Sequence, residues 1–479
     1  MPSSRCWYGI APGKAAVAYL PIAVDFQSPG SQPRPVAPLV TLHAARRAFR
    51  MALADSIWLE TKTTMPKIAL VLTCLAMLAA GSSKPRDLKS EVEDTMARED
   101  VRAALAHVDS DRPRILEEWK RLTEINAPSG KERTRAEAVR LLLKSCKLDK
   151  VYYDETGNLV AIRKGTGGGK AVVFDAHLDT VFQEGQRIKA EIRDGKIFAP
   201  GVGDNTRNVE ALLASIRAID RAGIKTKGDL IFVFTVEEET NMAGARRFVS
   251  ENLARIGQYV ALDGGYEGLT YGGIGINWYK HHFIGPGGHT RSRTPPYSAS
   301  LPLARAIDRI YALELPKDPK VDLNVGMLGG SEVVNAKAAD AWFTVDLRST
   351  DQKLIDEYER RIAEILREEA ARAGVQVRTE VIGEKLPAAQ IPGNRESFTV
   401  RMSEAVHQAV GFERVPVTAT ASNNANVALL AGLPAISTGC APCEGGHSAG
   451  EWCWIDPIYR GIRKLILLEV MLAGLNPTE

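Results

Sequence analysis

Three things that the sequence lacks restrict what this protein can be. Six cysteines in 479 residues are too few for a small scaffold held together by disulfides. The chain also lacks a large excess of charge of either sign, because 61 basic and 58 acidic residues leave a formal net charge of only +3. The chain as a whole therefore lacks the strong positive electrostatic potential that would attract nucleic acid or an anionic membrane. Finally, it contains no apolar run of the roughly 20 residues that a membrane-spanning helix needs.

The composition is that of a folded globular protein. Hydrophobic residues make up 45% of the chain and charged residues 25%, which are ordinary values. At about 100–200 residues per domain, the length allows roughly two to four domains. A chain of this kind can bury a full core, so it is neither a disordered scaffold nor a fibre.

Residues 65–83 have the parts of a secretory signal peptide. Met65-Pro66-Lys67 is a basic start, residues 68–80 form a short apolar core, and small residues follow. An uncleaved anchor or a buried helix is the alternative. Residues 1–64 are rich in Pro, Ala, Ser and Arg, and they form a disordered extension unless translation begins at Met65. A signal peptide would send the protein to a bacterial periplasm or to the exterior.

The rest of the chain first alternates strands with helices. Apolar runs predict strands at 159–162, 171–176, 230–235 and 259–262, and helical periodicity predicts helices within 113–147 and at 209–222 and 243–253. This rhythm predicts an α/β domain with a mostly parallel sheet. The charged residues 84–112 would form a helical lead-in, so we expect the folded body to begin near Pro113.

At Gly285 the alternation of predicted strands and helices gives way to a different order. The pattern predicts a strand at 276–284, a helix at 298–314, strands at 321–328 and 338–347, a helix at 351–373 and a strand at 375–381. That order, βαββαβ, is ferredoxin-like. Helices at 397–410 and 424–431 and strands at 415–419 and 434–437 then resume the α/β character. We therefore expect a main domain of residues 113–284 and 394–479, interrupted by an inserted domain at 285–393.

Polar side chains follow several of the predicted strands. They are His177 and Asp179, Glu237-Glu238-Glu239 and Asp263; two further candidates are Asp204, just before a predicted helix, and His447, in a Gly-rich segment near the C-terminus. Open α/β sheets place ligand sites at the ends of their strands. Mixed His and carboxylate ligands suit zinc, cobalt or manganese. Together these residues predict a metal site.

Each piece has a simpler interpretation when taken alone. His177 could be a surface or capping residue. Asp204 stands just before a predicted helix and could cap it. Three consecutive glutamates repel one another unless a cation gathers them or water screens them, so Glu237-Glu238-Glu239 could be a solvated acidic face.

The motifs and their order resemble the M20 family of co-catalytic zinc metallopeptidases, the M20/M25/M40 group. The family pattern runs H-x-D-T, G-x-x-D-D-K, D/E-E-E-x-G, a further D/E, and a late G-x-H-x-x-x-E. The resemblance covers about residues 113–475 and includes the inserted domain, which the family uses as a lid and dimerisation domain. It implies a zinc-exopeptidase-like fold, two Zn²⁺ ions per subunit, with Co²⁺ or Mn²⁺ as substitutes, and a homodimer formed through the lid.

The resemblance also implies a role for each matching residue. Glu238 would be the general base, and Asp179 would orient the imidazole ring of His177 without binding the metal itself. The implied metal ligands are His177 and Asp263 for one zinc, Glu239 and His447 for the other, and Asp204 as the bridge between them. In the lid, His289 would reach the partner subunit's site and stabilise the oxyanion. Asn335 and Arg348 would bind substrate, although Arg348 could instead form a structural ion pair with Asp346.

Thr206 stands where the family has Lys, and three further departures are asparagines. Asn205 stands where the family has a second Asp, Asn241 replaces a Gly, and Asn424 replaces an Asp. None of them removes an implied ligand, so we expect activity. The expected function is an exopeptidase for short peptides, amino- or carboxypeptidase. The alternatives are an N-acyl amino acid deacylase and an inactive metal-binding peptide binder.

Four cysteines follow the signal-like segment. In an oxidising compartment, a bridge among Cys440, Cys443 and Cys453 would stiffen the loop that carries His447, and the spacing leaves the pairing open. A structural zinc knuckle is the alternative. Cys146 is expected to be a buried thiol.

Overall fold

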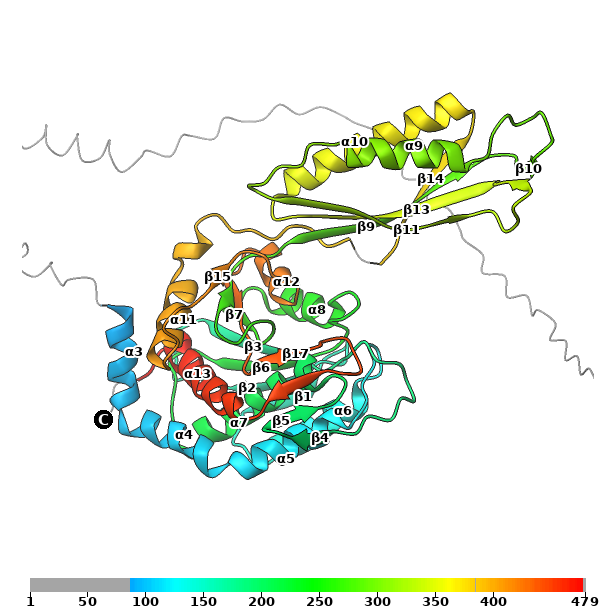
Figure 1. The fold of residues 1–479 in the computed structure, drawn as a ribbon. Coiled ribbons are helices and arrows are strands. Elements are labelled where there is room, and N and C mark those ends of the chain that lie inside the picture. Colours follow the sequence, from blue (N-terminus) through cyan, green and yellow to red (C-terminus); the bar gives the residue numbers. More distant parts are fainter. Residues whose placement is uncertain (1–86, 384, 477–479) are drawn as a thin grey trace, which may run out of the picture. The chain divides into compact units, whose positions relative to one another are not determined.

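The computed structural model describes residues 87–383 and 385–476, drawn in colour in Figure 1. These residues belong to one structural unit, 84–479. The expected extension at 1–64 and the expected signal peptide at 65–83 lie outside the described residues. Among the described helices, none is both long and apolar enough for a membrane crossing.

The main sheet has eight strands in the order β1-β2-β6-β3-β7-β16-β8-β15. Their bounds are β1 Lys150–Tyr153, β2 Leu159–Arg163, β3 Ala171–His177, β6 Leu230–Thr235, β7 Ile256–Ala261, β8 Leu269–Thr270, β15 Val417–Thr418 and β16 Ala435–Ser437. The central pairs β6–β3, β3–β7 and β7–β16 are parallel, whereas β1–β2 and β2–β6 are antiparallel. The predicted α/β class with a mostly parallel sheet is therefore confirmed.

Both faces of the central strands are buried, which explains their continuous apolar runs. In β6, Phe232 and Phe234 belong to one core, and Ile231 and Val233 belong to a second core on the opposite face. Five of the helices that pack into the first core are α5 Arg112–Thr123, α6 Arg133–Leu143, α7 Arg207–Arg221, α11 Phe398–Ala409 and α13 Asp456–Ala473. The second core is covered by α8 Ala243–Asn252 and α12 Ala425–Leu430.

The folded body begins earlier than the sequence suggests. Helices α3 (Leu88–Ala97) and α4 (Glu99–Ser110) precede Pro113 and pack into the first core. Val101, Ala104 and Val108 of α4 are fully buried, and α4 contacts α7 and α13. The expectation that the body starts near Pro113 is therefore wrong. The prediction of helices in this segment is right, because its sparse apolar residues recur at helical spacing.

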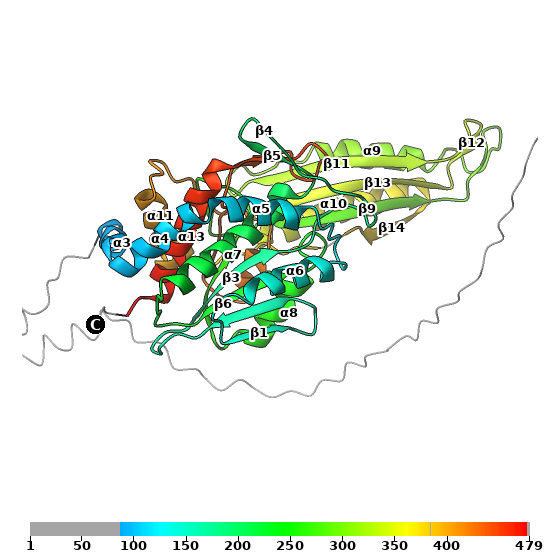
Figure 2. The ribbon, with the colours of Figure 1, turned by 90° about the horizontal axis from the view of Figure 1, so that it is seen from below.

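A second, antiparallel sheet has the strand order β11-β13-β9-β14. Its strands are β9 Gly275–Ile284, β11 Val321–Gly330, β13 Asp340–Ser349 and β14 Gln376–Val381. Helices α9 (Ser300–Tyr311) and α10 (Gln352–Ala373) share a separate core with it. In Figure 2, α9 and α10 lie along this sheet. The chain order βαββαβ and this strand order are the ferredoxin-like arrangement that the sequence predicts.

The small elements were not apparent from the pattern. One sheet joins β17 Cys443–Glu444, β18 Trp452–Trp454, β5 Lys196–Phe198 and β4 Glu191–Arg193, and another pairs β10 Gly288–His289 with β12 Ala336–Lys337. The helical turns η1 Val202–Thr206 and η2 Asn394–Glu396 complete the described elements. Strands of two or three residues are too short to show a periodicity. The β17–β18 hairpin matters most here, because it carries His447 in its connection.

Candidate metal centre

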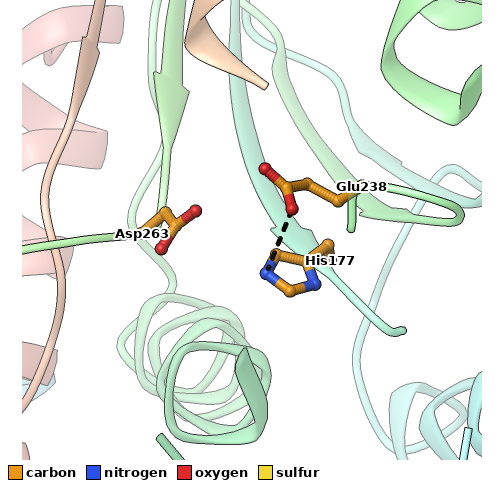
Figure 3. A group of neighbouring side chains, drawn as sticks. All are labelled: His177, Glu238 and Asp263. Carbon is orange, nitrogen blue, oxygen red and sulfur yellow. Dashed lines mark ion pairs between the residues drawn. The ribbon is translucent and has the colours of Figure 1, made fainter. Parts of the chain in front are cut away.

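The polar residues picked out in the sequence meet at one edge of the main sheet. His177 is the last residue of β3, Glu238 follows β6 by three residues, and Asp263 follows β7 by two. Because β3, β6 and β7 are parallel neighbours, their carboxyl ends share that edge. Figure 3 shows the side chains of His177, Glu238 and Asp263 around a common space. Open α/β sheets place ligand sites at this kind of edge.

The Asp204 carboxylate stands between two histidines. Its Oδ1 lies 3.0 Å from His177 Nε2, and its Oδ2 lies 3.1 Å from His447 Nε2. His447 Nε2 is also 3.1 Å from Glu239 Oε2, and His177 Nε2 is 4.0 Å from Glu238 Oε2. The two histidines thus lie at different oxygens of Asp204, and Glu239 lies next to His447. This is the arrangement of a carboxylate that could join two cations.

Potential ligand atoms converge in two overlapping groups. His177, Glu238 and Asp263 form one group and His177, Asp204 and Glu239 form the other, with ligand atoms within 4.8 Å of one another. Nitrogen and oxygen donors of this kind suit Zn²⁺ and its first-row neighbours. The residues present therefore fit a metal cofactor. Proximity alone does not separate ligands from a base, because Glu238 and Glu239 each belong to a group.

The carboxylates at this edge strongly disfavour being charged together. Burial, with the neighbouring acids, raises the pKa of Glu239 to about 7 and that of Asp263 to about 6, and it raises the pKa of Glu238 well above its usual range. Burial acts in the same direction on Asp204, but hydrogen bonds from His177 and His447 outweigh it and lower the pKa of this carboxyl. A bound cation would offset the repulsion among the charged forms.

The pKa values of the two histidines are also raised, which for an imidazole favours the charged form. Burial disfavours the charged form of His177, but Glu238 and hydrogen bonds to Asp179 and Asp204 outweigh it and hold the pKa of this imidazole well above its ordinary value. The hydrogen bond to Asp204 raises the pKa of His447 to about 9. The neighbouring carboxylates thus favour the protonated forms of both histidines.

Asp179 organises the opposite side of His177. Its Oδ1 accepts the Glu238 N–H at 3.0 Å and its Oδ2 accepts the Glu239 N–H at 3.0 Å. Oδ1 also lies 3.4 Å from His177 Nδ1, and this nitrogen is 3.1 Å from the main-chain oxygen of Asp179. With Nδ1 donating there, Nε2 is left to face Asp204. The outer-shell partners of a metal ligand fix the ring in this way.

Two supporting residues were not found by sequence reasoning. Glu451 accepts the backbone N–H groups of Gly201, Gly203 and Asp204. Ser129 donates its hydroxyl to Asp179 Oδ2 at 2.6 Å. Only Glu451 had a sequence signal, since it is the last position of the G-x-H-x-x-x-E motif that ends the family pattern.

The three candidate residues within 285–393 fall into two groups. His289 and Asn335 are exposed beside the β10–β12 pair, where the Thr290 N–H donates to the Asn335 carbonyl at 2.9 Å. In the described part of the chain, no hydrogen bond or ion pair links either of them to the carboxylates. Arg348 Nε lies 2.9 Å from Asp346 Oδ1, so the ion pair is present. Arg348 also lines a cavity of about 460 Å³ together with Glu238, Glu239 and His447.

The three asparagines that depart from the family pattern leave the ligand groups intact. Asn205 is buried and donates to the Leu262 carbonyl at 2.9 Å, next to Asp263. Asn424 donates to Thr235 Oγ1 at 2.9 Å. Asn241 accepts the Ala243 N–H at 2.8 Å at the start of α8. Each of these amides supports backbone or a neighbouring hydroxyl near the site.

A disulfide closes the hairpin that carries His447. Cys443 and Cys453 are bonded, with a sequence separation of 10, and Cys440 is a buried free thiol. Cys443 and Cys453 are also register partners in the β17–β18 pair. The open choice among the three cysteines is thus decided, and no structural zinc knuckle forms from them. Cys146 is half-buried rather than fully buried.

Comparison with known proteins defines the class. Residues 173–468 match peptidase family M20/M25/M40, so the chain belongs to this family. It is 28% identical over 138 residues to carboxypeptidase G2 of Pseudomonas, covering 28% of this chain and 33% of that enzyme. It is 24% identical to acetylornithine deacetylase of Shigella sonnei over 50% of this chain and 66% of that protein. The chain thus spans about a third of carboxypeptidase G2 and less than two thirds of the deacetylase.

Solved structures share the fold. A tripeptidase from Staphylococcus aureus superposes with a TM-score of 0.67 at 22% identity, covering 76% of this chain and 98% of that protein. The YxeP protein of Bacillus subtilis, described as a dinuclear metal-binding peptidase, superposes with a TM-score of 0.59 at 13% identity. It covers 76% of this chain and 99% of that protein. At these identities the likeness establishes the fold alone.

Metal binding should weaken on acidification. Protons compete with the cation for Glu239 and Asp263, whose pKa values of about 7 and 6 are raised by burial, and a ligand carboxyl must lose its proton to bind. We expect the apparent Zn²⁺ affinity to fall by more than about a hundredfold between pH 8 and pH 5.5, because His447, with a pKa of about 9, must also lose its proton to bind. Calorimetry in buffers of different ionisation enthalpy would measure the affinity and the proton release. An affinity that does not change with pH would mean that other groups hold the metal.

Proposed function

We propose that this protein is a two-metal hydrolase that removes terminal residues from short peptides. The observation that carries this proposal is the Asp204 carboxylate between His177 and His447, with Glu238 beside it. Membership of the M20/M25/M40 family supports the same reading. Zn²⁺ is the proposed metal, because the donors are imidazole nitrogens and carboxylate oxygens.

Each metal position would take one histidine and one further carboxylate. His177 and Asp263 would hold one ion, Glu239 and His447 the other, and Asp204 both. The distance of 3.1 Å between Glu239 Oε2 and His447 Nε2 supports this division. Two bound cations would lower the pKa of a shared water and polarise the substrate carbonyl.

Glu238 is the proposed general base. It lines the same cavity as His447 and Arg348, and its backbone is fixed by the hydrogen bond to Asp179. Its raised pKa, caused by burial, favours a carboxylate that accepts a proton from water and later returns it to the leaving amine. Glu239 is closer to His447 and is better placed as a ligand.

The cavity beside Glu238 suits a short substrate. Met242, Ile276 and Trp278 give it apolar walls, and Arg348 supplies a positive charge. We propose that this guanidinium reads a substrate carboxylate, in addition to its ion pair with Asp346. A volume of about 460 Å³ suits a ligand of di- or tripeptide size. The tripeptidase from Staphylococcus aureus has the same fold.

An N-acyl amino acid deacylase is the second candidate function. Its support is the similarity to acetylornithine deacetylase over half of this chain. A deformylase from Halalkalibacterium halodurans is also 28% identical over 160 residues, 30% of this chain and 38% of that protein. The same base and metals would serve both reactions, because each breaks an amide bond. The substrate decides between them.

We further propose that residues 285–393 act as a lid and as the contact of a homodimer. His289 and Asn335 are exposed on the β10–β12 pair and have no link to this chain's own carboxylates in the described residues. In a dimer, His289 would enter the site of a second copy and stabilise the oxyanion there.

Export to a periplasm or the exterior is also part of the proposal. The signal-like segment at 65–83 suggests it. The disulfide between Cys443 and Cys453 supports it, because such bonds persist in oxidising compartments.

The function is tested by supplying substrates to the zinc-loaded protein. Di- and tripeptides and N-acyl amino acids should be incubated with and without a chelator, and products identified by mass. We expect chelator-sensitive release of a terminal residue from peptides, and the products will show which end is read. Hydrolysis of the acyl substrates alone would support the deacylase instead. No turnover of either class would contradict the proposed function.

The role of Glu238 is tested by Glu238→Gln, which keeps the shape of the side chain and removes the base. We expect kcat to fall by about 10²–10⁴-fold with the metal content unchanged. Glu237→Gln is the matched control, since Glu237 is the neighbouring acid and is not among the clustered ligand atoms. Equal rates for the two variants would refute a catalytic role for Glu238.

A further inference from the structure

Glu451 is a buried carboxylate that the proposed chemistry does not use. It is 1% exposed and stands four residues after His447. Its Oε2 accepts the Gly201 N–H at 2.6 Å, and its Oε1 accepts the N–H groups of Gly203 and Asp204 at 2.7 and 2.8 Å. Hydrogen bonds to an ionised acceptor are about twice as strong as neutral ones. Three of them on one side chain fix the loop that ends at Asp204.

The loop is shaped to let this carboxylate approach. A Cβ on Gly203 would lie 2.7 Å from Glu451 Oε1 and 2.8 Å from Cys443 Cβ, so a larger residue would displace the loop. Gly201 has a φ of 73°, which favours glycine. The Gly-Val-Gly sequence before Asp204 thus serves the contact with Glu451.

The hairpin that carries Glu451 also carries His447. Both lie within the ring that the Cys443–Cys453 disulfide closes. One side chain therefore connects the backbone of Asp204 to the hairpin of His447, and these two residues are 3.1 Å apart at Asp204 Oδ2 and His447 Nε2. Displacement of either partner would change that distance.

We propose that Glu451 is the positioning residue of the metal centre, holding the Asp204 loop and the His447 hairpin in register so that Asp204 can serve both metals. This inference rests on the two-metal function proposed above. Because Asp204 would be shared, loss of Glu451 should weaken both metal positions. Loss of a ligand that belongs to one position, such as Asp263, should weaken mainly that one.

The chemistry of the contact requires a carboxylate. Three N–H groups point at Glu451, and a carboxylate accepts with both of its oxygens. A glutamine has one carbonyl oxygen, and its NH₂ group would face at least one N–H donor. Glu451→Gln therefore keeps the volume of the side chain while it breaks the contact. Glu444→Gln is a matched control, since Glu444 is an exposed acid in the same hairpin.

The experiment measures metal affinity by chelator competition with Zn²⁺, and the absorption spectrum with Co²⁺, for the full chain and both variants. For Glu451→Gln we expect affinity to fall by about 10–100-fold at both positions and the Co²⁺ spectrum to change. Glu444→Gln should match the unchanged protein. The thermal unfolding of the metal-free proteins, measured in parallel, separates lost positioning from general destabilisation.

Unchanged affinity and spectrum in Glu451→Gln would overturn the inference and leave the two-metal function standing. An unchanged protein that binds no metal would overturn both. If Glu451→Gln does not fold, Gly203→Ala decides, because it keeps Glu451 and disturbs the same contact. Gly203→Ala should lose affinity at both positions, and full affinity in that variant would refute the positioning role.

Discussion

The central physical constraint on this protein is the electrostatic repulsion among four carboxylates that lie close together at one edge of the main sheet. Asp204, Glu238, Glu239 and Asp263 converge where parallel strands end. Burial raises the pKa of three of them, and only Asp204, held between two histidines, has its pKa lowered. Such a cluster is costly unless cations offset it. The rigid frame of the sheet is what holds these groups together against their repulsion.

Two further carboxylates keep the cluster in place by binding backbone. Asp179 accepts the N–H groups of Glu238 and Glu239, and Glu451 accepts three N–H groups up to Asp204. One thus fixes the loop after β6, and the other fixes the loop before α7. Loops carry much of the site, and these hydrogen bonds hold the loop backbones in fixed positions. A preorganised metal site requires such support.

Much of this could be read from the sequence, for identifiable reasons. The strands at 171–176 and 230–235 are apolar runs because both faces of the sheet are covered, and His177 and Glu238 stand out as polar residues at their ends. The early start of the fold was missed because α3 and α4 bury few residues, such as Val92 and Val101. The disulfide partner of Cys443 follows from the register of β17 and β18. This register could not be predicted, because strands of two and three residues show no sequence pattern.

The central claim is that Asp204 joins two metal positions, and anomalous diffraction from crystals of the zinc-loaded protein tests it most directly. The account predicts two anomalous peaks per chain. One should contact His177 and Asp263, the other should contact Glu239 and His447, and Asp204 should contact both. A single peak, or peaks away from Asp204, would contradict the account.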